Sequence, residues 1–279
     1  MNSARSSVRA LAVWLARGVD SWFGDRPFED GGKVTDGRFS VGLLKRQGKS
    51  IDVSVRFNAS FHLPNLEETY IFFGRDDPRD VVSDKPVELS RKELLLAQSN
   101  ADRAFFAGIG RSLTDSVDFR LGLRGGLKPY AQGRYRKQWE FGTEGLAEFR
   151  QTVFWSLADR AGSTTAFSYE HLFSPVVAAR WLTSATITQA SKKFEWSSLL
   201  GAYRSFGNQR LLSLEALVNG QQGSGVVATD YGLQSRWEQP VYGDWLVGGI
   251  VIGHFWPRPD ARTERRGAWA MGVGLKMQF

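Results

Sequence analysis

The sequence predicts an all-β fold, an antiparallel barrel of about fourteen strands that crosses a membrane and follows a short amphipathic helix. Three observations support this prediction. Apolar and polar residues alternate with period two from residue 38 to residue 279. The chain contains no run of 18 apolar residues that would make a transmembrane helix. The 30 Gly, 10 Trp and 19 Phe accompany the alternation, whereas the hydrophobic content of 42% would also suit a soluble domain.

The last 13 residues, Gly267–Phe279, show the alternation most clearly. One face carries only large apolar side chains: Trp269, Met271, Val273, Leu275, Met277 and Phe279. The other face carries small or polar ones. This stretch resembles the closing strand of bacterial outer-membrane β-barrels. The resemblance implies the bacterial outer membrane as location, Phe279 as an assembly signal, and the barrel-assembly machinery as a partner.

The alternation delimits the individual strands, each near the length that crosses a bilayer at a steep tilt. We expect them at residues 38–46, 50–63, 68–75, 102–110, 115–124, 128–139, 146–157, 162–172, 176–188, 192–204, 209–219, 226–238, 242–256 and 264–279. The third and fourth strands alternate least regularly, so about twelve strands is the competing count.

The chain divides into residues 1–36, an N-terminal helix and linker, and residues 37–279, the barrel. Apolar residues recur at three- and four-residue steps over 6–23, which predicts an amphipathic helix. Such a helix can plug a lumen, anchor at the rim or pack on a partner. The apolar run at 10–16 is too short for a signal peptide and no cleavage site follows it, so we expect residue 1 to belong to the mature protein.

Connections of one parity hold Pro64, Pro175 and Pro240, and we assign these connections to the periplasmic side as short turns. The other parity holds the long segment 76–101 and the charged stretch 257–266, both assigned to the extracellular side. Residues 87–98 are expected to form a short helix there. The acidic residues of 76–80 either bridge lipopolysaccharide through cations or are solvated loop charges.

Tryptophans are expected in two interfacial girdles, where the amphipathic indole is favoured. Three fall at periplasmic strand ends: Trp139, Trp237 and Trp245. Four fall at extracellular ends: Trp155, Trp196, Trp256 and Trp269. Trp181 lies in the middle of a strand and fits neither girdle.

Charged side chains fall on the face that points into the lumen. The cationic ones are Arg56, Arg120, Arg124, Arg134, Arg136, Arg150, Arg180, Arg236 and Lys276. Two interpretations remain open. The charges form ion pairs across a narrow lumen, or Arg120, Arg124, Arg134 and Arg136 form a basic ladder that favours anions.

Other classes of function find little support in the sequence. The net charge of +7 is spread along the chain, so we expect no nucleic-acid partner. There is no Cys, and the three histidines lack the His-x-Ser arrangement of lipid-modifying barrels. We therefore expect no catalytic residue, no metal site and no cofactor.

The chain from about residue 22 resembles an uncharacterised group of proteobacterial outer-membrane proteins. The resemblance rests on residues 20–25, Arg56–Leu66, Gln151–Trp155, Tyr231–Leu233 and the terminal strand. Its size is also similar to that of small monomeric porins with about fourteen strands. These features together predict a porin-like channel for small solutes, anions included, with the N-terminal helix as plug or rim anchor. The alternative is a structural scaffold that docks a protein through 6–23 or 76–101, and a lipid-modifying enzyme comes third.

Overall fold

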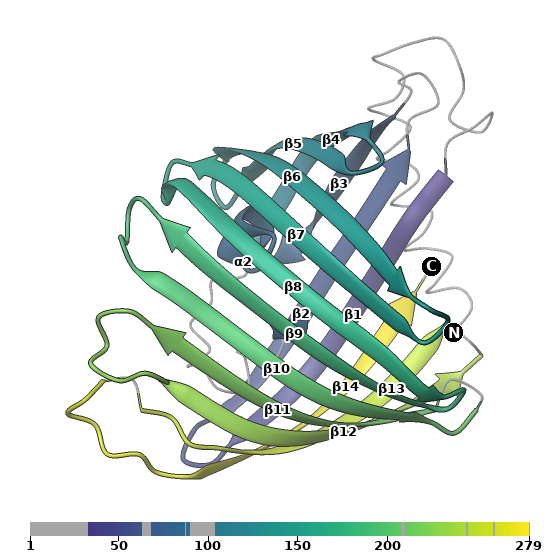
Figure 1. Ribbon diagram of the computed structural model, residues 1–279, viewed down its shortest axis with the longest axis vertical. Coiled ribbons are helices and arrows are strands. Elements are labelled where there is room, and N and C mark those ends of the chain that lie inside the picture. Colours follow the sequence, from purple (N-terminus) through teal and green to yellow (C-terminus); the bar gives the residue numbers. More distant parts are fainter. Residues whose placement is uncertain are drawn as a thin grey trace.

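The computed structural model describes residues 33–62, 68–86, 88–89, 104–207, 210–243, 245–258 and 260–278. Fourteen antiparallel strands close into a barrel (Figure 1). Each strand pairs with its neighbours in sequence, and β1 pairs with β14 to close the wall. The predicted fold class and strand count are confirmed, and the competing count of about twelve is wrong. Among the described residues, no helix is long and apolar enough to cross a membrane.

The strands are β1 (Lys33–Arg46), β2 (Ile51–His62), β3 (Thr69–Asp76), β4 (Ala104–Thr114), β5 (Val117–Arg124), β6 (Lys128–Phe141), β7 (Gly145–Ser156), β8 (Arg160–Ser174), β9 (Val177–Thr188), β10 (Phe194–Ser205), β11 (Leu211–Gln221), β12 (Asp230–Tyr242), β13 (Leu246–Phe255) and β14 (Ala268–Gln278). Most ends fall within a few residues of the prediction. One helix, α2 (Pro78–Ser83), lies between β3 and β4.

Pro240 was expected in a turn, but β12 continues through it to Tyr242. Pro240 faces Val247 of β13, and the register shifts between Pro240 and Tyr242. A proline lacks the N–H that a ladder needs, so strands tolerate it beside such an irregularity near an end. The turn therefore comes later than predicted.

The outer face of the wall is apolar. On β14 four residues expected to face outward, Trp269, Met271, Val273 and Leu275, are exposed, whereas the inward Ala270 is buried. Met277, expected on the same outward face, is instead buried against Trp245 and Leu246. The mid-strand Trp181 also faces outward, and its Nε1 donates a hydrogen bond to Ser198 Oγ at 3.0 Å. That bond satisfies the indole N–H away from either girdle.

Aromatic side chains also line part of the inner face, which the sequence did not indicate. Tyr70, Phe72, Phe106, Tyr130 and Phe154 pack there around Val82 of α2. These rings lie over glycines of neighbouring strands, as Phe72 does over Gly108 and Tyr130 over Gly122. Because β3 and β4 are apolar on both faces, apolar and polar residues alternate least regularly in these two strands.

The β3–β4 connection turns into the barrel instead of standing outside it. In Figure 1, α2 lies within the ring of strands. Its start is set by Asp77, whose side chain accepts a hydrogen bond from the Arg79 N–H at 2.8 Å, and by Pro78 in the first turn. Its end is set by Asp84, which has a left-handed backbone with φ 52°. The inward fold of residues 76–86 was not predicted, whereas the assignment of the connection to the extracellular side stays a prediction.

Several predictions fall outside the described residues. These are the helix at 6–23, most of the helix at 87–98, and the side chain of Phe279. Each stays a prediction.

The glycines beneath the inner rings provide a stability test. A Cβ at Gly110 would lie 2.3 Å from Tyr70 Cζ, whereas at Gly133 the nearest atom would be Val153 Cγ2 at 3.6 Å. We expect Gly110→Ala to destabilise the barrel by about 1–3 kcal/mol through overpacking. Gly133→Ala is the matched control and is expected to change stability by less than about 1 kcal/mol. Urea unfolding in detergent micelles, followed by Trp fluorescence, measures both, and equal midpoints would contradict the close packing of Tyr70 on Gly110.

Candidate functional site: the lumen and its inward-folded loop

Helix α2 is fixed to the inner wall by both polar and apolar contacts. Gln132 of β6 is buried, and its Nε2 donates to the carbonyl oxygens of Val81 at 2.7 Å and of Val82. The Val82 side chain is fully buried in the inner aromatic cluster. The last turn of a helix leaves its carbonyls without intrahelical partners, and Gln132 supplies those partners here.

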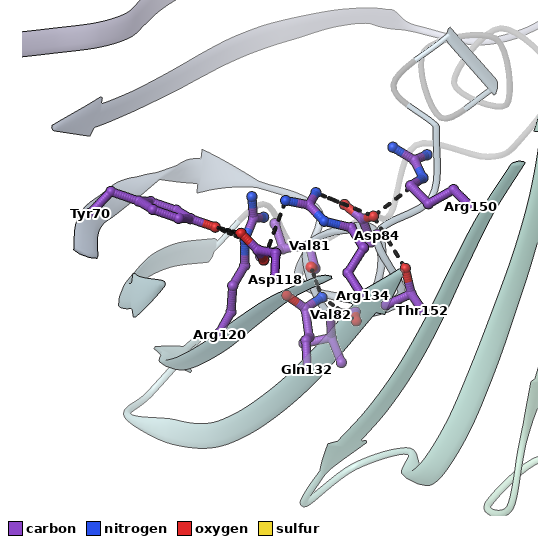
Figure 2. A network of polar contacts seen from close by, with 10 residues as sticks. All are labelled: Tyr70, Val81, Val82, Asp84, Asp118, Arg120, Gln132, Arg134, Arg150 and Thr152. Atoms are coloured by element: carbon purple, nitrogen blue, oxygen red, sulfur yellow. Dashed lines mark hydrogen bonds and ion pairs between the residues drawn. The ribbon is translucent and has the colours of Figure 1, made fainter. Parts of the chain in front are cut away.

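Asp84, at the end of α2, is the charged anchor of the loop (Figure 2). It lies 3.3 Å from Arg134 Nη1 of β6 and 3.3 Å from Arg150 Nε of β7, and it accepts a hydrogen bond from Thr152 Oγ1 at 3.2 Å. Burial alone would raise the pKa of this carboxyl, but the Arg150 and Arg134 guanidiniums outweigh burial and lower it below 3.8. Asp84 is therefore ionised at neutral pH.

Asp118 of β5 extends the network along the wall (Figure 2). It pairs with Arg120 Nε and with Arg134 Nη2, each at 3.3 Å, and it accepts a hydrogen bond from the Tyr70 hydroxyl. The Arg120 guanidinium also lies 5.1 Å from the centre of the Phe72 ring. Arg134 thus joins the loop carboxylate Asp84 to the wall carboxylate Asp118.

The loop also reaches a second part of the wall. Leu89 is buried against Leu182 of β9 and Leu199 of β10. Glu88 Oε1 lies 3.1 Å from Arg180 Nη1, and Arg180 Nε lies 2.9 Å from Glu170. Because α2 is held at β6 and β7 while Leu89 is held at β9 and β10, the described part of the loop follows the inner wall over several strands.

Two chambers lie in the lumen beside this loop, each of about 450 Å³. One chamber lies on the side where β1 starts and β14 ends, and it is here named the termini-end chamber. It is mostly cationic. Its charged lining residues are Arg38, Arg136, Arg150, Arg180, Lys276, Glu88 and Glu148. The far-end chamber has a nearly balanced set: Asp77, Asp80, Asp159, Glu195, Arg79, Lys85 and Lys193.

The nine predicted lumen cations behave differently from one another. Ion pairs are formed by Arg120 with Asp118, by Arg124 with Asp159, and by Arg134 with Asp84 and Asp118. Arg150 and Arg180 hold the loop, while Arg56 pairs with Asp76 at 3.5 Å and Arg236 with Glu238 at 3.5 Å. Lys276 lines the termini-end chamber. Of the basic ladder, Arg120, Arg124 and Arg134 follow the ion-pair interpretation, and only Arg136 makes no side-chain ion pair with the described residues.

Sequence reasoning missed Arg38, Asp84 and Gln132. Asp77-Pro78 is a helix-start signal from which α2 could have been predicted, but it was not used. No local signal, however, relates Asp84 to Arg134, which is 50 residues away in the chain.

Six of the seven girdle tryptophans lie within two residues of a strand end, whereas Trp237 lies inside β12, five residues before Tyr242. Trp139 is near the end of β6, and Trp237 packs on Phe206 at the β10–β11 turn. At the opposite rim His254 lies between Trp256 and Trp269, with ring centres 4.5 Å and 4.6 Å away. His171 contacts Phe173 and Tyr169.

Among the described residues no group of three or more potential metal ligands occurs.

Loss of the Asp84 anchor is expected to release α2. Its side chain is 15% exposed, so we expect Asp84→Asn to destabilise the loop attachment by about 2 kcal/mol, less than for a fully buried pair. The chain has no Cys, so Ser83→Cys, at a position only 8% exposed, introduces a single reporter thiol. Maleimide labelling of this thiol is expected to be roughly thirtyfold faster with Asp84→Asn.

Asp260→Asn, in the β13–β14 connection, removes the same charge away from the loop and serves as the control. Equal labelling rates in the Asp84 and Asp260 variants would show that the ion pairs do not hold the helix.

Solved structures with the same architecture are known. The chain is similar to the anion-selective porin from Comamonas acidovorans, with a TM-score of 0.52 and 8% identity over 89% of this chain and 100% of that one. It is also similar to the outer membrane channel DcaP of Acinetobacter baumannii, with a TM-score of 0.50 and 8% identity over 90% and 98% of the two chains. At such identities the likeness shows the fold. No protein-family model and no curated protein matches the sequence, so the resemblance to an uncharacterised proteobacterial group stays a prediction.

Proposed function

We propose that this chain is a porin-like channel of a bacterial outer membrane that passes small solutes and favours anions. The observation that carries the proposal is the charge of the termini-end chamber, where five cationic side chains face two carboxylates. A cationic wall inside a low-dielectric barrel raises the local concentration of anions and lowers that of cations.

The barrel itself supports a channel. A wall of fourteen strands encloses a lumen wider than side chains alone fill. The outer face is apolar, as contact with lipid requires, and the inner face holds a dense set of ion pairs. The inward-folded loop narrows this lumen, so it acts as the constriction in this proposal.

The orientation follows the usual arrangement of outer-membrane barrels, with both chain termini in the periplasm. The termini-end chamber is then periplasmic, and the far-end chamber opens to the outside. An anion entering from outside passes a nearly neutral chamber, then the loop, and then the cationic chamber.

A scaffold role receives less support. That role requires a partner to dock on 6–23 or 76–101, but Val82 and Leu89 of the second segment are buried in the lumen. Residues 6–23 lie outside the described residues, and their role as plug or rim anchor remains a proposal. The lipopolysaccharide contact proposed for 76–80 is also weakened, since Asp76 pairs with Arg56 and Asp77 caps α2.

Single-channel recording in a planar bilayer under a KCl gradient tests the proposal. We expect steady ohmic steps and a reversal potential biased toward chloride. Arg136→Glu is expected to move the reversal potential toward that of potassium, because it reverses a charge in the termini-end chamber. Lys137→Glu is the control, because Lys137 is adjacent in the chain but lies 5.5 Å from the ring of the outward-facing Trp139. A silent barrel, or a wild-type channel biased toward cations, would refute the proposal.

The conductance is also expected to depend on pH through Asp84. The pKa of this carboxyl is lowered in the folded state, so its stabilising effect is present above its ordinary value of 3.8 and is lost as pH falls through the lower folded pKa. We expect the loop to stay attached from pH 7 to pH 3.8, and larger, noisier currents to begin only as the pH falls below 3.8. The Asp84→Asn channel should show the large, noisy currents across the whole range. The same acid-induced change in wild type and in this variant would assign it to another group.

A further inference from the structure

Two arginines face each other directly on the lumen wall. Arg136 of β6 and Arg150 of β7 are partners in the strand register, and both line the termini-end chamber. Like charges in such positions destabilise a sheet. Asp84 compensates Arg150, with the two side chains 3.3 Å apart. Arg136 is exposed to the chamber and makes no side-chain ion pair with the residues that the structure describes.

A second group of positive charge lines the same chamber from β1 and β14. Arg38 and Lys276 are close neighbours there, because Ser40 pairs with Lys276 and Arg38 with Gln278 in the β1–β14 register. Arg38 Nε is buried and has no hydrogen-bond partner among the described residues. The outer N–H groups of the Arg38 guanidinium are the ones that an anion in the chamber would contact.

The two carboxylates of the chamber form no ion pair with Arg38 or Arg136 in the described structure. Glu88 pairs with Arg180 at 3.1 Å, and Glu148 accepts a hydrogen bond from Gln138 Nε2 at 2.7 Å. Neither compensates Arg38 or Arg136 in the described structure. The chamber therefore presents two separate cationic groups, one on β1 and β14 and one on β6 and β7, around a volume of about 450 Å³. This volume falls within the range of small-molecule sites.

We propose that the termini-end chamber is a saturable binding site for compact organic polyanions with two or more carboxylate groups. One carboxylate is bound by Arg136 beside Arg150, and another by Arg38 beside Lys276. Guanidinium groups suit this role because their fork of N–H donors matches a carboxylate. A ligand with a single carboxylate reaches only one of the two groups, so a polyanion gains from both within one molecule.

This inference rests on the proposed channel, since it names the solutes that the channel would select. It also differs from simple anion preference. A diffuse positive potential favours chloride and citrate according to charge alone, whereas a built site saturates and depends on individual arginines.

Titration calorimetry on the full-length barrel in detergent, with citrate, succinate and acetate at matched ionic strength, tests the site. We expect saturable binding of citrate and succinate, and none of acetate. Arg38→Gln and Arg136→Gln should each weaken citrate binding about tenfold, because each removes one charged donor group. Arg136→Lys should retain part of the affinity. Lys137→Gln, which removes a charge from the outer side of the same strand, should leave the affinity unchanged.

Recording with citrate added to planar bilayers separates this inference from the proposed function. Citrate should reduce chloride conductance saturably in wild type and far less in the Arg38→Gln/Arg136→Gln double variant. If citrate and acetate reduced the chloride conductance of an anion-selective channel equally, the polyanion site would be refuted. The proposed channel function would be retained. Citrate binding by a barrel without steady conductance would retain the site and overturn the channel. Unchanged citrate affinity in the folded double variant would also overturn the site.

Discussion

The shape of the lumen depends on the ion pairs between Asp84 and the two wall arginines, Arg134 and Arg150. A carboxylate at the end of α2 is held where two neighbouring strands each present a guanidinium. Gln132 and Val82 add a hydrogen-bonded and an apolar contact at the same place. Since a helix of six residues has little stability alone, these contacts with the wall keep it folded and in position.

The apolar inner cluster and the polar network have complementary roles. Rings such as Phe72 and Tyr130 fill the space over glycines and form a surface on which α2 packs. The adjoining arginines are compensated by Asp84, Asp118 and Asp159, so this half of the wall is nearly neutral. The uncompensated positive charge is concentrated instead around Arg38 and Arg136, on the side toward the chain termini.

The sequence predicted much of the fold because strand periodicity is a local property. Alternation over residues such as Trp269–Phe279 assigns each side chain to a face, and fourteen such segments define the barrel. It placed Arg120, Arg124, Arg134 and Arg136 in the lumen but gave no information on their partners. Those partners, such as Asp84 for Arg134, come from distant segments that only the closed barrel brings together. The inner aromatics were missed for a related reason, because apolar residues on a lumen wall make sense only when a loop covers them.

The pairing of β1 with β14 has a consequence for how the molecule forms. Residues 38–46 of the first strand pair with residues 270–278 of the last strand. The contact that closes the barrel therefore joins segments that lie far apart in the sequence. Such contacts of high sequence separation form slowly, because a long chain must be ordered before they contribute. Until β14 pairs with β1, the open edges of the sheet present unpaired backbone N–H and C=O groups. Other chains can form hydrogen bonds with these groups. The β1–β14 seam is therefore the step of folding at which aggregation competes most directly with closure.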